Sequence, residues 1–403
     1  MSIQSLSLQG KKVLVRVDFN VPLDENRQIT DDTRLRGALS TIQYILDAGG
    51  AAILMSHLGR PQKKKLANGN LDRARFSLNA VIKPLSNLLG QKVIFCHKTV
   101  GNEAKKAVAD LEMGQVLLLE NTRFHKEEKK GEEAFARELS LLGDVYINDA
   151  FGTAHRAHAS TCTVAQFFDK TNRGYGFLIA KELEEAQKLT NNPARPFTAI
   201  VGGAKVSDKI TLLEQLVDRV DHLLIGGGMA YTLLKAQGGL VGKSLLEEDK
   251  LETARQLLAK AKANNVTVLL PEDSIAAAAF DKDASPNTVE SANIPNDLMG
   301  LDIGPKAINA FSEVILASKS LIWNGPMGVF EWENFSQGTL KIADAVASAT
   351  QAGAFSLIGG GDSVAAINQA GKAEEVSFVS TGGGAMLELL EGKTLPGIAA
   401  VQD

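Results

Sequence analysis

The stretch IVGGAKVSDKITLLEQLVDRVDHLLIGGGM, residues Ile200 to Met229, holds two short apolar runs, two glycine clusters and one helical pattern. The run before Gly202 has the length of a buried strand, and apolar residues then recur from Ile210 to Val220 at helical spacing. The order is strand, glycine turn, helix, strand and second glycine turn. It predicts one crossover unit of a parallel sheet.

The first glycine turn has features of a phosphate-binding site. Gly202 and Gly203 lack a Cβ atom, so their backbone N–H groups can approach an anion, and a helix N-terminus directly after them would add partial positive charge. Lys205 and Lys209 are four residues apart, and we expect them on one face of the first helical turn. A tight turn with solvated lysines would also explain this stretch alone. The later glycine-ended strand AFSLIGGG favours phosphate binding.

Length and composition restrict the class of protein. A chain of 403 residues predicts two to three domains, and the net charge of -4 offers no general field for nucleic acid. Cys96 and Cys162 form no C-x-x-C pair, which is typical of a reducing compartment. The first residues lack a secretory pattern, and no apolar run approaches the ~20 residues that span a bilayer. We therefore expect a cytoplasmic protein without a membrane or nucleic-acid partner.

Strand and helix patterns alternate along both halves of the chain, which predicts α/β domains with parallel sheets covered by helices on both faces. The charged helical stretch Lys181 to Leu189 is interpreted as a connector between two domains, and the alanine run Ala276 to Ala279 as a helix. In such sheets, ligands bind beyond the carboxyl ends of the strands. Polar side chains follow several predicted strands of the first half: Asp18, Asn20, His57, Arg60, Arg123 and Arg156.

A single arginine of this group would be explained by a surface ion pair. Several arginines at one sheet edge instead predict bidentate binding of a carboxylate or phosphate. In the second half, Asp362 follows a glycine-ended strand, where it could hold Mg²⁺, cap the next helix, or do both. Glu331 could accept hydrogen bonds from ribose hydroxyls.

Four other motifs do not match the sites that they resemble. GGLVGKS, from Gly238 to Ser244, fails the spacing of a P-loop, and no strand leads into it. GGGMAY and GGGDSV miss the dinucleotide-binding pattern, which leaves a nicotinamide enzyme as a weak alternative. His155 and His158 lack a third ligand, so a zinc site is not favoured.

Ten motifs in order resemble the phosphoglycerate kinase family over essentially the whole chain: RVDFNVP, SHLGRP, LLLENTRFH, NDAFGTAHRAH, GGAKVSDK, IGGGMA, GLDIGP, WNGPMGVFE, IGGGDS and STGGGAMLELLEGK. The resemblance implies two Rossmann-like domains joined by a helical hinge, residues 1–175 and 176–389, with residues 390–403 packing back on the first. It implies a monomeric phosphotransferase with a carboxyl acceptor, which moves a phosphoryl group reversibly from 1,3-bisphosphoglycerate to MgADP. Mg²⁺ and ATP or ADP are the implied cofactor and co-substrate.

The resemblance also implies the site residues. Those for 3-phosphoglycerate are Asp18, Asn20, Arg34, His57, Arg60, Arg123 and Arg156. Those for the nucleotide phosphates and Mg²⁺ are Lys205, Lys209, Gly360, Gly361, Asp362 and Ser363, with Asp362 as the metal ligand. Those for the adenosine side are Gly203, Ala204, Gly227, Gly300, Leu301, Asn324, Pro326 and Glu331. Two residues depart from the common family pattern: Ser40 replaces a proline and Ser363 a threonine.

Phosphoryl transfer depends on positioning and charge neutralisation. We expect Arg34 and Lys205, with backbone N–H groups at Gly361 and Gly383, to stabilise the group in transfer, without a general base. The alternatives are another small-molecule kinase and a catalytically silent nucleotide-binding protein. Because the charges lie on different halves, we also expect hinge closure near residues 181–192 and 380–384.

Overall fold

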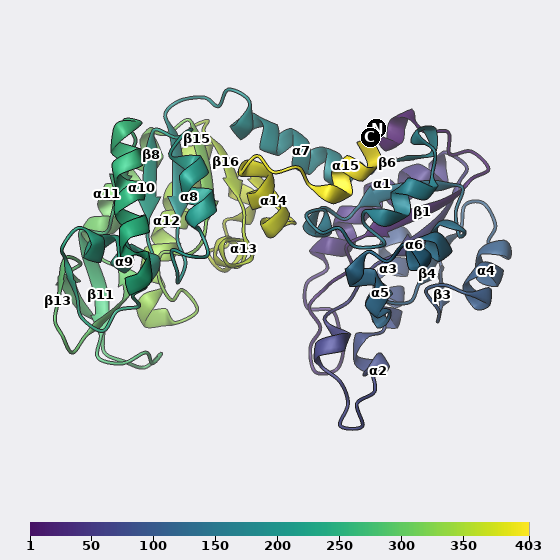
Figure 1. Cartoon of the computed structure of the whole chain (residues 1–403), viewed down its shortest axis with the longest axis horizontal. Helices are drawn as coiled ribbons and strands as arrows, with labels where there is room; N and C mark the ends of the chain where they lie inside the picture. Colours follow the sequence, from purple (N-terminus) through teal and green to yellow (C-terminus); the bar gives the residue numbers. More distant parts are fainter. Residues whose placement is uncertain (403) are drawn as a thin grey trace. The chain divides into compact units, whose positions relative to one another are not determined.

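The computed structural model describes residues 1–402 and divides into two compact units (Figure 1). The first comprises Met1–Glu184 and the segment from Thr394 onward, and the second comprises Glu185–Lys393. Helix α7 (Phe177–Thr190) carries the chain across the boundary between Glu184 and Glu185. The expected connecting helix is therefore present, and it begins a few residues before Lys181.

A six-stranded parallel sheet in the order β3-β4-β2-β1-β5-β6 forms the centre of the first unit. Its strands are β1 (Lys12–Val17), β2 (Ala51–Met55), β3 (Val93–Cys96), β4 (Val116–Leu119), β5 (Val145–Asp149) and β6 (Arg173–Tyr175). Strands β2 and β4 are continuous apolar runs, and every residue of β2, β4 and β5 is buried, as expected of a sheet that is covered on both faces.

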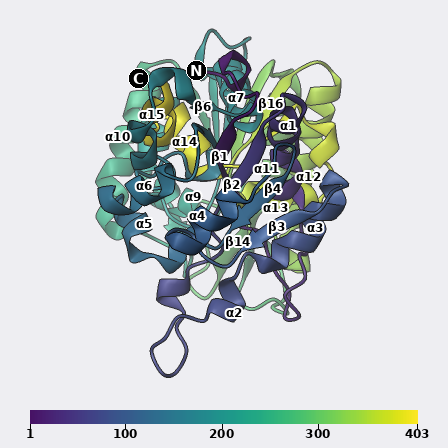
Figure 2. The same ribbon diagram turned by 90° about the vertical axis from the view of Figure 1, so that its right-hand side faces the viewer.

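Helices cover both faces of this sheet (Figure 2). The helices of the first unit besides α7 are α1 (Thr33–Asp47), α2 (Arg73–Phe76), α3 (Asn79–Leu89), α4 (Asn102–Ala109), α5 (Lys126–Lys130), α6 (Glu133–Ser140) and α15 (Pro396–Gln402). Leu35 and Ile42 of α1 pack with Val15 on one face, whereas Leu139 of α6 and Val401 of α15 join the core on the other. The period-2 alternation of β1 thus separates two apolar layers.

The second unit is built on another six-stranded parallel sheet, in the order β10-β8-β7-β15-β16-β17. Its strands are β7 (Phe197–Val201), β8 (His222–Ile225), β10 (Thr267–Leu269), β15 (Ser320–Asn324), β16 (Phe355–Ile358) and β17 (Phe378–Val379). Its helices are α8 (Ile210–Leu216), α9 (Met229–Ala236), α10 (Leu251–Ala263), α11 (Pro305–Ala317), α12 (Gln337–Gln351), α13 (Gly361–Gln369) and α14 (Gly383–Leu390). The α/β prediction for both halves is confirmed.

The stretch between β10 and α11 contains strands where the sequence analysis predicted a helix over the alanine run. It forms a three-stranded sheet of β11 (Asp273–Ala277), β12 (Asn287–Glu290) and β14 (Met299–Ile303), and β9 (Leu240–Val241) pairs with β13 (Asn293–Ile294). The prediction of a helix for the alanine run is therefore wrong, because Ala276 and Ala277 lie in β11. Pairing with β14 and full burial of these two residues outweigh the intrinsic helix propensity of alanine.

Candidate active site

In the first unit, the predicted polar residues Asp18, Asn20 and His57 lie just beyond the carboxyl ends of neighbouring strands β1 and β2. The Asn20 Oδ1 atom accepts a hydrogen bond from the Gly59 N–H at 2.7 Å, which ties the two loops together. Arg34, in the first turn of α1, forms an ion pair with the Asp18 carboxylate. Asp18 is thus both buried and paired, and it holds the guanidinium of Arg34 at the strand ends.

A cationic cavity of about 220 Å³ lies beside these loops. Its lining includes the predicted residues Arg60, Arg123 and Arg156, together with Lys63 and Lys129. These basic side chains converge from separate loops and helices, so the cavity combines concentrated positive charge with the volume of a small anion. The structure therefore brings all three predicted arginines to one place.

Arg123 is the most deeply buried arginine of this cavity. Its side chain donates a hydrogen bond to the Gly59 carbonyl at 2.8 Å, and its buried Nε atom has no partner within the protein. Burial, with the charges of Arg16 and Arg156, lowers the pKa of Arg123 to about 10. The guanidinium nevertheless remains charged at neutral pH. An anion in the cavity would offset both its desolvation and its repulsion from the other arginines.

His57 lies nearby and is 3% exposed. Burial lowers the pKa of His57 well below its usual range, and the charges of Arg123, Arg16, Arg34 and Arg156 lower it further. Its Nδ1 atom lies 3.1 Å from an Arg16 nitrogen. His57 is therefore neutral at physiological pH and can bind a ligand only through a hydrogen bond.

Sequence reasoning missed Arg16, Glu128, Lys129 and Ser160. Arg16 and Glu128 are fully buried and are linked through the Ser160 hydroxyl. One signal for Arg16 was available, because it is a charged residue inside the apolar strand pattern KVLVRV. No comparable signal marked Glu128, which lies in the charged run KEEKK and looks like a solvated residue.

In the second unit, the glycine turns that follow β7, β8, β15 and β16 meet at one edge of the sheet. A Cβ atom on Gly227 would lie 2.6 Å from the Gly203 carbonyl oxygen, and one on Gly202 would overlap the backbone of Pro326. Gly203 and Gly227 also have positive φ angles of 127° and 69°. Glycine is therefore required at these turns both by conformation and by the close approach of backbones.

The predicted placement of the two lysines is wrong. Helix α8 begins only at Ile210, so Lys205 lies in the preceding loop and Lys209 is the residue before the helix. No helix N-terminus directly follows Gly203. The Lys209 ammonium donates to the Asn324 Oδ1 atom at the end of β15, and burial lowers its pKa while Asp362 opposes that change. Lys209 therefore still points toward the glycine-lined edge.

The helix N-termini at this edge belong to α13 and α14. Gly360, with a φ angle of 97°, precedes α13, and Gly361 and the exposed Asp362 lie in its first turn. Gly383, the first residue of α14, is in backbone contact with Gly360. The buried Ser363 hydroxyl accepts a hydrogen bond from the Gly325 N–H at 2.5 Å, so this serine performs a structural task that a threonine hydroxyl would also serve.

The remaining predicted residues lie in β14, at the end of β15 and in loops. The Gly300 N–H donates to Ser244 at 2.9 Å, and there is no space for a side chain at Gly300 because Tyr231 lies against it. The Leu301 carbonyl accepts a hydrogen bond from Val329 at 2.9 Å, which links this strand to the loop that carries Glu331. Ala204 and Glu331 are exposed, whereas Asn324 is buried and donates to the Gly359 carbonyl at 2.6 Å.

Within residues 1–402, no cluster of three or more histidine, cysteine or acidic side chains is arranged to hold a metal ion. His158 is buried in cationic surroundings, and burial with the charges of Arg123 and Arg16 lowers its pKa to about 3. The Asp362 carboxylate, whose charge acts most strongly on Lys209 among three nearby acidic side chains, fits a Mg²⁺ ion that takes its other ligands from water and nucleotide phosphates. None of the helices within residues 1–402 is long and apolar enough to cross a bilayer.

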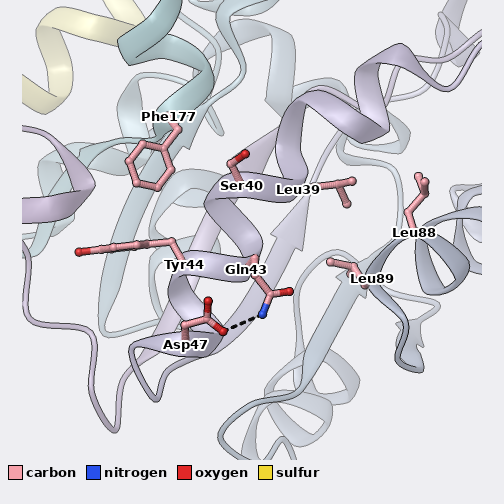
Figure 3. A pocket seen from close by; sticks show the side chains of 8 residues that line it. All are labelled: Leu39, Ser40, Gln43, Tyr44, Asp47, Leu88, Leu89 and Phe177. Atoms are coloured by element: carbon pink, nitrogen blue, oxygen red, sulfur yellow. Dashed lines mark hydrogen bonds between the residues drawn. The ribbon is translucent and has the colours of Figure 1, made fainter.

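Ser40, the other departure from the family pattern, lies away from the cationic cavity. It lines a hollow of about 450 Å³ formed by α1, the end of α3 and Phe177 (Figure 3). Helix α1 is continuous from Thr33 to Asp47 through this position. The serine therefore leaves the helix that carries Arg34 intact.

Comparison with known proteins is consistent along the whole chain. The family profile described as "Phosphoglycerate kinase" matches residues 3–393. A phosphoglycerate kinase of a Synechococcus species is 53% identical and aligns over 98% of this chain and 96% of its own length. That of Chlorobium phaeobacteroides is 52% identical, with 100% and 99% covered.

Solved structures agree with this result. Phosphoglycerate kinase from Coxiella burnetii superposes with a TM-score of 0.86 at 40% identity, covering 100% of this chain and 98% of that one. The Pyrococcus horikoshii enzyme gives a TM-score of 0.80 at 29% identity, with the same coverage. The chain belongs to the phosphoglycerate kinase family, a family of phosphotransferases with a carboxyl acceptor.

Proposed function

We propose that this protein catalyses reversible, direct in-line transfer of a phosphoryl group from 1,3-bisphosphoglycerate to MgADP, giving 3-phosphoglycerate and MgATP. The observation that carries the assignment of substrate is the cavity lined by Arg60, Arg123 and Arg156. A nucleotide site alone would suit many small-molecule kinases. The arginine cavity adds a site for a second, strongly anionic substrate.

In this proposal, Arg60, Arg123 and Arg156 bind the phosphate of 3-phosphoglycerate. Asp18, Asn20 and His57 contact the rest of the molecule by hydrogen bonds. These roles are supported by the positions of the six side chains at the strand ends and around the cavity. Burial and the nearby arginines lower the pKa of His57 so far that its ring is a poor proton acceptor, and we assign it as a substrate ligand and not as an acid or base.

The nucleotide is assigned to the glycine-lined edge of the second unit. Gly203, Ala204, Gly227, Gly300, Leu301, Asn324, Pro326 and Glu331 would surround adenosine. Gly360, Gly361, Asp362, Ser363, Lys205 and Lys209 would surround its phosphates. The support is the convergence of these turns and of the N-termini of α13 and α14, where unpaired N–H groups favour anions.

Catalysis would rest on electrostatics. Arg34 and Lys205 stabilise the charge of the group in transfer, aided by backbone N–H groups at Gly361 and Gly383. Mg²⁺, held by Asp362 and the nucleotide, would neutralise phosphate charge. The accepting oxygen is already a carboxylate or a phosphate, so no side chain needs to remove a proton.

A coupled assay with purified protein, 3-phosphoglycerate and MgATP tests the proposal through release of ADP. Turnover with 3-phosphoglycerate, and none when glycerate replaces it, is the expected result. Turnover with a different carboxylic acid, and none with 3-phosphoglycerate, would identify another small-molecule kinase. Nucleotide binding without any turnover would identify a silent binding protein.

We further propose that the protein is a monomer in the cytoplasm. The two free cysteines are in keeping with a reducing compartment. Gel filtration at assay concentration would test the oligomeric state, and cell fractionation would test the location.

A further inference from the structure

The imidazole of His57 is held by Arg16, a residue outside the proposed set of substrate ligands. Arg16 is the second-to-last residue of β1 and is fully buried. One of its terminal nitrogens lies 3.1 Å from His57 Nδ1, its other terminal nitrogen donates to the Val17 carbonyl, and its Nε atom is 2.8 Å from the Ser160 hydroxyl. Each nitrogen of this guanidinium therefore has a defined partner.

Ser160, one of the three partners of Arg16, is fixed in turn by Glu128. The Ser160 hydroxyl donates to Glu128 Oε1 at 2.5 Å, and the Ser160 backbone N–H donates to Oε2 at 3.0 Å. A hydroxyl has one proton, so Ser160 can only accept from Arg16 when it donates to the carboxylate. The hydrogen bonds consequently run in one direction, from Arg16 through Ser160 to the buried Glu128.

An arginine side chain has donors and no acceptor. The His57 Nδ1 atom that faces Arg16 must therefore offer its lone pair, which leaves the ring proton of the neutral imidazole on Nε2. We infer that Arg16 is a positioning residue that fixes His57 as the Nε2–H tautomer, so that His57 donates a hydrogen bond to an oxygen of 3-phosphoglycerate. This inference rests on the proposed function, because it takes His57 to be a substrate ligand.

The charges around the ring also favour a neutral imidazole without a proton on Nδ1. Arg16, Arg34, Arg123 and Arg156 all lower the pKa of His57, in addition to the effect of burial. The Asp18 carboxylate is the opposing charge, and its Oδ1 atom lies 3.9 Å from Nδ1, beyond hydrogen-bond distance. A proton on Nδ1 would face the Arg16 N–H groups without an acceptor.

The first test uses the unmodified protein with ¹⁵N-labelled histidine. Long-range ¹H–¹⁵N spectra distinguish the tautomers, and the His57 signals are assigned by their loss in His57→Gln. We expect an unprotonated Nδ1 and a protonated Nε2 at neutral pH, with the Nε2–H signal shifting when 3-phosphoglycerate is added. A proton on Nδ1 overturns the inference. If the Nε2–H signal does not shift when 3-phosphoglycerate is added, the proposed role of His57 as a substrate ligand is wrong, while the assignment of the tautomer is unaffected.

The second test is a cycle of variants. Arg16→Met should raise the KM for 3-phosphoglycerate about tenfold, the usual cost of one misdirected hydrogen bond, and leave the KM for MgATP unchanged. In the His57→Gln background, the same substitution should change that KM less than about twofold, because Arg16 acts through His57. An equal rise in both backgrounds would mean that Arg16 acts on the substrate directly, and would overturn the inference.

Ser160→Ala covers the case in which Arg16→Met fails to fold. It keeps both buried charges and removes only the hydroxyl between Arg16 and Glu128. We expect a mixture of His57 tautomers and a smaller rise in the same KM, both restored by Ser160→Thr. A pure Nε2–H tautomer and an unchanged KM in Ser160→Ala would show that the link from Arg16 to Glu128 has no positioning role.

Discussion

Gly383 packs directly on Gly360: a Cβ atom on Gly383 would lie 2.5 Å from the Cα atom of Gly360. Gly360 precedes α13 and Gly383 begins α14, so the two helices start at one point. The free N–H groups of both first turns therefore lie close together. We expect Gly383→Ala to separate them and to lower turnover at least tenfold, with a loss of about 1 to 3 kcal/mol in the free energy of unfolding.

Steady-state kinetics and urea unfolding would measure both effects. Gly361→Ala is the matched stability control, because no atom lies within 4 Å of the position of its Cβ. We expect it to unfold like the unmodified protein. Normal turnover in Gly383→Ala would show that the two helix ends need not be in contact.

Arg34 and Arg36 provide a matched pair on α1. Arg34 pairs with the buried Asp18, whereas Arg36 pairs with Asp32 at 2.8 Å on the surface. We expect Arg34→Ala to lower kcat on the order of 100- to 1000-fold with a much smaller change in the KM for 3-phosphoglycerate. Arg36→Ala should behave like the unmodified enzyme. A change confined to KM in Arg34→Ala would make Arg34 a binding residue only.

Asp362 is exposed at the first turn of α13, so its replacement tests the metal without disturbing the core. We expect turnover to require Mg²⁺, and Asp362→Asn to raise the Mg²⁺ concentration needed for half-maximal activity by at least tenfold. Asp344→Asn, which removes a surface ion pair with Lys341, is the control. Activity that persists in excess chelator would exclude the assignment of Mg²⁺.

His158 should make the protein sensitive to acid. Its pKa is lowered to about 3 in the folded state, so the unfolded chain binds the proton more readily below about pH 6.5. The stabilisation from a neutral His158 is therefore present above that pH and is lost as the pH falls. Between about pH 7 and about pH 4, the free energy of unfolding should fall in both proteins. We expect urea unfolding to show that it falls by up to about 3 kcal/mol more in the unmodified protein than in His158→Gln. Parallel curves for the two proteins would contradict this prediction.

The charges assigned to phosphoryl transfer belong to both units, and in-line transfer needs reacting atoms within roughly 3 to 3.5 Å. We therefore expect ligand-dependent closure, greatest when 3-phosphoglycerate and nucleotide are both bound. Small-angle scattering on the free protein, each binary complex and the ternary complex would measure it. An equal radius of gyration in all four states would count against closure.

The central strands were predictable because apolar runs such as LLIGGG and LIGGG leave few alternatives for a buried parallel strand. Reliance on local pattern also explains why the helix predicted at Ala276 is wrong. This residue has a high helix propensity, but pairing with β14 holds it in β11. Local pattern contains no information about such a partner. Strand pairing between distant segments decided the structure there.

The candidate site could be predicted where a sequence motif contains the polar or glycine residue that forms it. The loop that carries Lys205 was mistaken for helix, because the apolar period of α8 begins near it and gives no sharp start. Glu128 could not have been found, since its burial depends on Ser160, which lies 32 positions later in the sequence. The contact of Gly383 with Gly360 likewise exists only in three dimensions.

Helix α15 comes after the whole second unit in sequence, yet it belongs to the first (Figure 1). Val401 joins the apolar core beside Tyr146, and the Gly397 carbonyl accepts a hydrogen bond from Asn148 at 2.8 Å. On the ribosome, the first unit must therefore wait for the final helix before its core is complete, while the second unit already has all of its residues. Synthesis from the N-terminus thus allows the later unit to finish folding first, which reverses the usual order of domains.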